Sequence, residues 1–386
     1  MKVIDYHRGV GCCYLRGVGC CILAKAALHL SLPFILSPTQ PPTHPSLNQV
    51  IIALALLFSS SAAAPAERRV VSDELVAKVN EAGSTWKASL KHQSNPKAYG
   101  TFMPGDPQYK EGAKPLPVKT DFKTKVGDLP ADFSSMDNWA ECADIIGHIR
   151  DQSDCGSCWA FSSTETLNDR MCIVHGEHSL LSTEDTNDCA GLQYMSLGCN
   201  GGQPRGAWEF FVMEGVSSGG DNSATGAGDS CKPYAMASCY HHGDDQGNQT
   251  ACTDVPTERP TLCKPSCSEG AYPTAYADDK RFAKSAYAVR TVDNIMQEIY
   301  ESGPVTVAFT VYEDFEAYES GIYQHVSGRS LGGHAVKMVG WGVENGTEYW
   351  NIANSWNPTW GEGGFFRILK GVNECGIEGS VVAGAV

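Results

Sequence analysis

The sequence predicts an α+β fold of two lobes, one mainly helical and one mainly built of strands. Three observations predict it. The stretch from Ser157 to about Val174 has the apolar spacing of a helix, and strand-like patterns dominate from about Ala286 onward. The segment 217–269 between them is rich in Gly, Asp and Cys and is expected to form loops. The chain has 386 residues, 42% of them apolar, which is enough for two packed cores.

Two helices are expected before the strands. The first begins after Ser72, a plausible N-cap, and its apolar stripe is Leu75, Val76, Val79, Trp86 and Leu90. The second is the helix 157–174. Its apolar face would be Trp159, Ala160, Leu167 and Met171, and its solvent-facing side Glu165, Asp169 and Arg170. The later strands are expected at VTVAFTV, HAVKMVGWGV, EYWNIANSW and GFFRILK.

The N-terminal region resembles a targeting segment. Nine apolar residues from Val50 to Phe58 precede SSSAAAPA, the pattern of a signal-peptide core and its cleavage site, so residues 50–64 are interpreted in this way with cleavage after about Ala64 or Ala66. Residues 1–49 are interpreted as an atypical leader or a misassigned start. No apolar run is long enough for a membrane span.

Charge and cysteine content narrow the class of protein. The net charge of −15 argues against a nucleic-acid partner, which would call for a basic patch. Twelve of the sixteen cysteines lie between Cys142 and Cys375, and on a secretory route most of them would pair.

The stretch DQSDCGSCWAF raises a specific question, because Cys155 and Cys158 could be a redox dithiol, half of a zinc site, or a half-cystine beside a catalytic thiol. A redox role needs two free thiols near a βαβ pattern, and a zinc site needs four converging ligands. Neither context is indicated. Cys158 at a helix start would instead be a thiolate of lowered pKa.

Other residues supply what a cysteine nucleophile needs. His334 in GGHAV would lie at the mouth of a strand, and Asn354 in NIANSW at the end of the next one, within reach of the imidazole. The Gln152 side chain could join the Cys158 N–H in stabilising an oxyanion.

CGSCWAF, GGHAV and NSW with the preceding Gln resemble the papain family of cysteine proteases. The spacings from Cys158 to His334 and Asn354 exceed the family's usual range of about 130 to 150 residues, and the excess falls in the Cys-rich middle. Together with CNGG, GPV, YESGIYQHV, GWGVENGTEYW and CGIEG in order, this resembles the cathepsin B subfamily.

The resemblance implies a papain-like fold, with a helical left lobe, a β-barrel-like right lobe and the active site in the cleft between them. Residues 65–128 would be the propeptide and 129–386 the mature peptidase, starting at LPADF. Cys158 would attack the peptide carbonyl, His334 would protonate the leaving amine, and Asn354 would hold the ring.

Substrate-binding residues follow from the same resemblance. Gly201, Gly202 and Gly333 would bind substrate backbone, and Trp356 would shield the contact between His334 and Asn354. Ser380 stands where the family has an acidic residue that accepts Arg at P2, and Thr306 replaces a second nearby Glu. A bias toward apolar P2 residues is therefore expected.

The disulfide pairing implied by the family leaves Cys158 and Cys375 free. Both cysteines of a further disulfide known in the family are absent, and Ala190 stands at one of the two sites. The implied pairs are Cys142–Cys172, Cys155–Cys199, Cys189–Cys263, Cys231–Cys267 and Cys239–Cys252.

Residues 239–252 resemble the occluding loop of cathepsin B, which blocks one end of the cleft. His241 and His242, when protonated, would pair with a substrate's C-terminal carboxylate, so that C-terminal dipeptides are released. Asp151 matches the carboxylate that tethers the first histidine. The second tether, a loop Arg with an Asp, is absent, because the loop has no Arg and Thr359 stands in the Asp position. A looser loop and more endopeptidase activity are expected.

The sequence thus predicts a lysosomal, endosomal or secreted zymogen with endopeptidase and peptidyl-dipeptidase activity. Its expected partners are protein and peptide substrates, its own propeptide as inhibitor and inhibitors of the cystatin type. No metal, organic cofactor, nucleic acid or membrane span is expected. Asn248 and Asn345 lie in glycosylation sequons. The alternative is a catalytically weak or inactive papain-like binding protein, which would usually lack the nucleophile.

Overall fold

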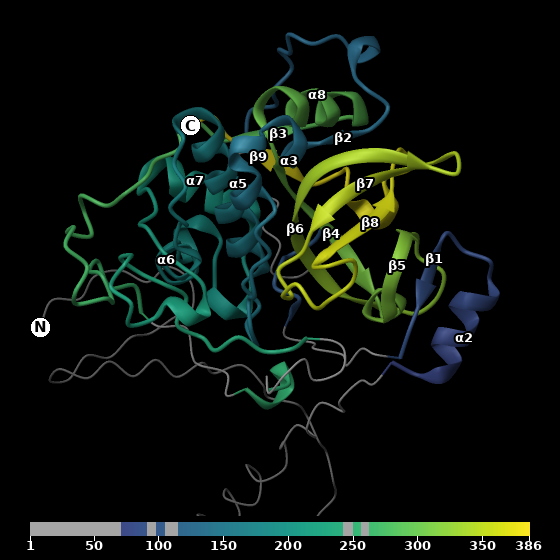
Figure 1. Cartoon of the computed structure of the whole chain (residues 1–386), viewed down its shortest axis with the longest axis horizontal. Helices are drawn as coiled ribbons and strands as arrows, with labels where there is room; N and C mark the ends of the chain where they lie inside the picture. Colours follow the sequence, from purple (N-terminus) through teal and green to yellow (C-terminus); the bar gives the residue numbers. More distant parts are fainter. Residues whose placement is uncertain (1–70, 91–97, 105–114, 242–249, 256–261) are drawn as a thin grey trace, which may run out of the picture. The chain divides into compact units, whose positions relative to one another are not determined.

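The computed structural model describes residues 71–90, 98–104, 115–241, 250–255 and 262–386, all within the compact unit Glu67–Val386. In this unit α5, α6 and α7 gather on one side and the strands of the sheet on the other (Figure 1). The helices are α2 (Asp73–Glu81), α3 (Ser135–Asn138), α4 (Ala143–Ile146), α5 (Cys158–His175), α6 (Thr183–Cys189), α7 (Pro204–Met213) and α8 (Val292–Ser302). The α+β class is confirmed, and no helix in the described ranges combines the length and apolarity that a membrane crossing requires.

The strands form a sheet in the order β1-β5-β8-β7-β6-β4-β9-β3, with β2 paired to β6. All of these pairs are antiparallel except the parallel pair of β5 with β8. The strands are β1 (Trp86–Ala88), β2 (Phe133–Ser134), β3 (Tyr287–Val289), β4 (Val305–Tyr312), β5 (Tyr318–Tyr323), β6 (Ser330–Glu344), β7 (Thr347–Ala353), β8 (Phe365–Leu369) and β9 (Val381–Ala383). The four strands expected at the C-terminal end are β4, β6, β7 and β8.

Strand β4 links the two cores because successive side chains of a strand point to opposite faces. Val305, Val307 and Phe309 enter the main core of the sheet. The intervening Thr306 and Ala308 face α5, since Thr306 bonds to that helix and Ala308 packs against Cys158. Cys158 at the start of α5 therefore meets the sheet at β4 and β6.

Helix α5 is buried from Cys158 to Cys172 because it packs against β6, β4, α6 and α7. The expectation of a solvent-facing side is wrong, since Glu165, Asp169 and Arg170 are all buried. Arg170 donates to the carbonyl oxygens of Gly303, Pro304 and Gly384, and pairs with Glu298 at 2.9 Å. These partners come from elements far along the chain, so the helix pattern alone could not indicate them.

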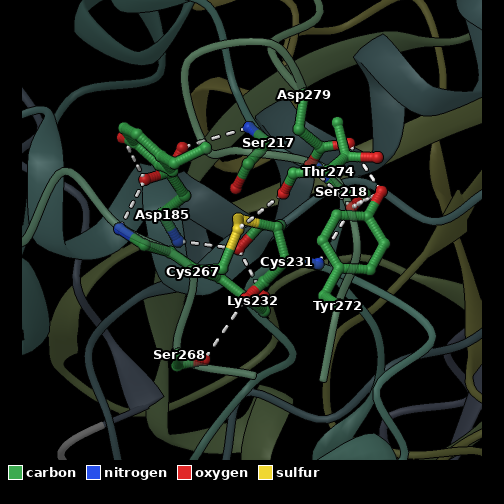
Figure 2. The surroundings of a disulfide bond; sticks show 12 residues. Asp185, Ser217, Ser218, Cys231, Lys232, Cys267, Ser268, Tyr272, Thr274 and Asp279 are labelled. Atoms are coloured by element: carbon green, nitrogen blue, oxygen red, sulfur yellow. Dashed lines mark hydrogen bonds and ion pairs between the residues drawn. A yellow bond between two sulfur atoms is a disulfide. The ribbon is translucent and has the colours of Figure 1, made fainter. Parts of the chain in front are cut away.

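Disulfides and buried ion pairs hold the helical lobe, and the five pairs are those that the resemblance implies. Around Cys231–Cys267, Asp185 pairs with Lys232 at 2.9 Å, and the backbone N–H and hydroxyl of Ser218 donate to Asp279 (Figure 2). The described parts of the loop-rich segment are therefore held by cross-links and polar contacts more than by helices or strands.

The N-terminal helix is shorter than expected. Ser72 caps α2 by accepting from the Leu75 N–H at 3.2 Å, but the helix ends at Glu81 and Gly83 adopts φ 65°. Trp86 then enters β1, which pairs with β5, so its predicted place on the helical stripe is wrong. Leu90 is half exposed.

Candidate active site

Cys158 is the first residue of α5 and lies at the junction of the lobes. Its side chain is fully buried and packs against Ala308 of β4, Ala335 of β6 and Met103. The hydroxyl of Thr101 lies 3.3 Å from its Sγ. The thiol is therefore covered by residues 101–103, which belong to the expected propeptide.

His334 and Asn354 meet as the sequence predicts. The Nε2 of His334, on β6, lies 2.8 Å from the Oδ1 of Asn354, just after β7. The indole of Trp356 stacks on the imidazole with ring centroids 4.6 Å apart, and both rings are fully buried. With Nε2 committed to Asn354, Nδ1 is the ring nitrogen left for a thiol.

The pKa of Cys158 differs from that expected of a thiol at an exposed helix N-terminus, and the pKa of His334 is shifted as well. Burial raises the pKa of the Cys158 thiol, although hydrogen bonds from its neighbours oppose this. Burial also lowers the pKa of His334 to about 4, against the effect of Asn354. Desolvation disfavours both charged forms, so burial shifts the thiol and the imidazole toward their neutral forms.

The Gln152 side chain lies beside the cleft and is fixed at both ends. Its Oε1 accepts from the Ser355 hydroxyl at 2.7 Å, and its Nε2 donates to the carbonyl oxygens of Cys155 at 2.7 Å and Ala98 at 3.1 Å. A donor aimed at a carbonyl of residue 98 has the orientation that an oxyanion would use.

Residues 98–103 pass through the cleft along the expected substrate-binding glycines. The Gly202 N–H donates to Gly100 at 2.8 Å, and the Thr101 N–H donates to Gly333 at 3.0 Å. A Cβ on Gly333 would lie 2.2 Å from the Thr101 carbonyl oxygen, so only glycine allows this approach. A Cβ on Gly201 would lie 2.7 Å from the nearest ring carbon of Phe102.

The two residues expected near P2 are placed differently. Ser380 is half-buried, and its carbonyl accepts from the Ala308 N–H at 3.2 Å, beside the cleft. Thr306 is fully buried, and its hydroxyl lies 3.1 Å from both the Trp208 Nε1 and the Thr166 hydroxyl. Thr306 thus contacts the helical lobe in the covered state, and its expected contact with substrate stays a prediction.

Sequence reasoning missed the residues that fill this part of the cleft. The Met103 side chain packs on Cys158, Ala308 and Ala335, and its methyl carbon approaches Gly376. The alternation of β4 could have indicated Ala308, but nothing in the sequence marks Met103 or Thr101 as the occupants.

Asp151 holds the base of the disulfide-closed loop. Its buried carboxylate accepts from His241 Nε2 at 2.7 Å, from the Ser238 hydroxyl at 2.7 Å, and from the N–H groups of Cys239 and Ser153. Burial acts to raise its pKa, but His241 and these hydrogen bonds outweigh that effect and hold the pKa below its usual range. His242 and Asn248 lie outside the described residues.

The loop base also brings together ligand-type atoms of Cys239, His241 and Cys252. The two sulfurs are joined in a disulfide, so they offer no thiolates to a metal. Asn345 is exposed in the turn between β6 and β7, where a glycan could be attached.

Comparisons with known proteins agree with this geometry. The model of the family described as papain family cysteine protease matches residues 132–385. Cathepsin B-like cysteine proteinase 5 of Caenorhabditis elegans is 44% identical over 341 residues, which cover 87% of this chain and 95% of that protein. Cathepsin B-like cysteine proteinase 4 of the same organism is 47% identical over 261 residues, or 66% of this chain and 75% of that protein. The solved structure of proCathepsin B S9 from Trypanosoma congolense matches with a TM-score of 0.67 and 30% identity, over 82% of this chain and 98% of that one. The chain therefore belongs to the papain family of cysteine proteases and is a cathepsin B-like cysteine peptidase made as a proenzyme.

Proposed function

We propose that this peptidase cleaves peptide bonds through Cys158 and His334, and that it releases C-terminal dipeptides as well as cutting internally. The observation that carries the proposal is the arrangement around α5. A thiol begins the helix, and an imidazole on β6 has one nitrogen bound to Asn354 at 2.8 Å. Gln152 directs its amide N–H groups into the same cleft.

The chemistry would begin once residues 98–103 leave the cleft. With solvent restored, the thiol proton passes to Nδ1 of His334 and the thiolate attacks the peptide carbonyl carbon. The Cys158 N–H and the Gln152 Nε2 stabilise the oxyanion. The imidazolium then protonates the leaving amine, and water hydrolyses the thioester to free the carboxylate product and the thiol.

Dipeptide release would depend on the loop 239–252. Asp151 and His241 form a buried pair at its base, and His241 is one of the two histidines expected to receive a C-terminal carboxylate. The small apolar surface at Ala308, with Ser380 in place of an acid, supports a preference for apolar P2 residues.

The zymogen assignment rests on the chain in the cleft. Residues 65–128 would be the inhibitory propeptide, with the mature enzyme starting at Leu129, just after the exposed stretch 125–128. Removal in an acidic vesicle or outside the cell would open the cleft to substrates and to cystatin-type inhibitors.

The test compares acid-activated wild type with Cys158→Ala and Cys375→Ala on paired peptides, one with a free C-terminus and one amidated. Cys375 is the other free thiol in the described chain, so it is the matched control. Products are identified by mass spectrometry at about pH 5. The proposal is supported if wild type and Cys375→Ala release dipeptides from the free-acid peptide and Cys158→Ala does not. Internal cleavage of both peptides leaves only the endopeptidase, and no Cys158-dependent cleavage favours an inactive binding protein.

A further inference from the structure

We propose that Asn357 and Thr359 are positioning residues that fix the base of the disulfide-closed loop (239–252) and thereby set the ratio of dipeptide release to internal cleavage. The inference rests on the proposed function, because it concerns how the loop limits access to the same cleft. It also revises the expectation of a looser loop, which came from the missing Arg and Asp pair.

The amide of Asn357 is oriented by its own neighbours. Its Oδ1 accepts from the Thr359 N–H at 2.8 Å and from the Thr359 hydroxyl, so its Nδ2 is turned to the Cys239 carbonyl oxygen, to which it donates at 2.8 Å. The residue is buried and adopts φ 58°, a left-handed conformation that asparagine tolerates. Thr359 stands where the resemblance implies an Asp that tethers the loop, and it acts on the loop only through Asn357.

Both backbone polar groups of Cys239, the N–H and the carbonyl, are consequently held by side chains. Its N–H donates to Asp151 at 2.9 Å, and its carbonyl accepts from Asn357. The first contact is to the carboxylate that also accepts from His241, whereas the second comes from a side-chain amide. The two contacts come from separate segments of the chain, so each is an anchor of its own for the loop base.

The second anchor also places the loop against the segment that carries the site. Asn357 follows Trp356 directly, and the His241 ring lies parallel to the Trp356 ring at a centroid distance of 6.0 Å. Trp356 in turn stacks on His334. Loosening Cys239 should therefore loosen the base of the loop while leaving the contact of His334 with Asn354 in place.

The experiment uses the full-length proenzyme, activated by acid, and three variants. Asn357→Asp keeps the acceptor for Thr359 but replaces the donor with a carboxylate oxygen facing the Cys239 carbonyl. Asn357→Gly keeps the left-handed conformation and removes the amide. Thr359→Val removes only the hydroxyl. Asn345→Asp is the matched control, because Asn345 is an exposed turn residue with φ 52°; all proteins are made without glycosylation.

The first readout is kcat/KM on a free-acid peptide divided by kcat/KM on its amidated form. Asn357→Asp and Asn357→Gly are expected to lower this ratio by about tenfold, the size of one lost buried hydrogen bond, and Thr359→Val by less. Asn345→Asp should leave it unchanged. A wild-type ratio in both Asn357 variants, or equal losses of the two activities, would overturn the inference.

The second readout does not depend on dipeptide release. In a Cys158→Ala background, hydrogen exchange at residues 238–241 should be faster in both Asn357 variants, with β4 and β6 unchanged as a check on folding. Faster exchange supports the anchor even if the wild type proves to be an endopeptidase only, so failure of the proposed function is distinguishable. Unchanged exchange contradicts the anchor.

Discussion

Glu165 should make the protein less stable at neutral than at acidic pH. It lies on α5 with 5% of its surface exposed, and its Oε1 has no hydrogen-bond partner among the described residues. The nearby Lys337 instead pairs with Asp169 at 2.9 Å and donates to the Ile146 carbonyl at 3.0 Å. Burial raises the pKa of Glu165 to about 7 and that of Asp169 to about 6, against the attraction of Lys337.

The sign and size follow from linkage. A carboxyl with a raised pKa in the folded state binds its proton more tightly there, so its full contribution to stability is present below its unfolded pKa of 4.5 and is lost as the pH rises to about 7. Because each pH unit is worth about 1.4 kcal/mol, Glu165 alone costs about 3 kcal/mol at pH 7.5 relative to pH 4. At roughly 2 °C per kcal/mol, this is about 6 °C in Tm.

The assay is thermal unfolding of the Cys158→Ala proenzyme with and without Glu165→Gln, at pH 4 and pH 7.5. Any packing cost of the new amide is common to both pH values, so the quantity compared is the change in the Tm difference between them. The Tm of Glu165→Gln minus the Tm of its parent should be about 6 °C larger at pH 7.5 than at pH 4. For Glu141→Gln, at an exposed site, this difference should be the same at both pH values. A Tm difference that is the same at both pH values, or that moves against the variant at pH 7.5, would refute the reasoning.

Three further outcomes are expected. The Cys158 thiol should be alkylated by iodoacetamide about 100-fold more slowly in the proenzyme than after activation, because burial raises its pKa. Peptide mapping distinguishes alkylation of Cys158 from that of Cys375. Equal rates before and after activation would contradict the covered thiol. Lys119→Ala should destabilise the Cys158→Ala proenzyme by about 1–3 kcal/mol in urea unfolding, since Lys119 pairs at 2.7 Å with the fully buried Glu298. Lys123→Ala is the control. An equal loss of stability in both variants would argue against a specific link between Lys119 and Glu298. Protein from a glycosylating host should carry a glycan on the exposed Asn345, seen as a mass that Asn345→Gln removes; an unmodified Asn345 would contradict this.

The residues that could be predicted from sequence are those whose chemistry leaves a local mark. His334 and Asn354 lie beside strand patterns, and the structure brings them within hydrogen-bond distance. The five disulfides were available only through the resemblance, because connectivity does not follow from cysteine spacing. The fold class followed from periodicity, since the helical and strand-like patterns lie in separate halves of the chain.

The errors have a common physical cause, which is burial by elements distant in sequence. Polar residues on α5 indicate a solvent-facing side, yet Glu165 and Asp169 are enclosed by β6. Trp86 continues a helical stripe in sequence, whereas Gly83 ends the helix and pairing with β5 places Trp86 in a strand.

The segment after β7 shows why the loop and the chemistry cannot be treated separately. Within four residues it supplies the Asn354 Oδ1 that accepts from His334, the stacking indole of Trp356, and the amide of Asn357 that holds Cys239. Its backbone is in turn fixed to the segment that carries Gln152, because the Gln152 N–H donates to the Ser355 carbonyl at 2.9 Å. A substitution that moves this segment would therefore alter both activities together, whereas one that removes only the Asn357 donor should alter the loop alone. The ratio of the two activities, more than either rate, is thus the quantity that reports on the loop anchor.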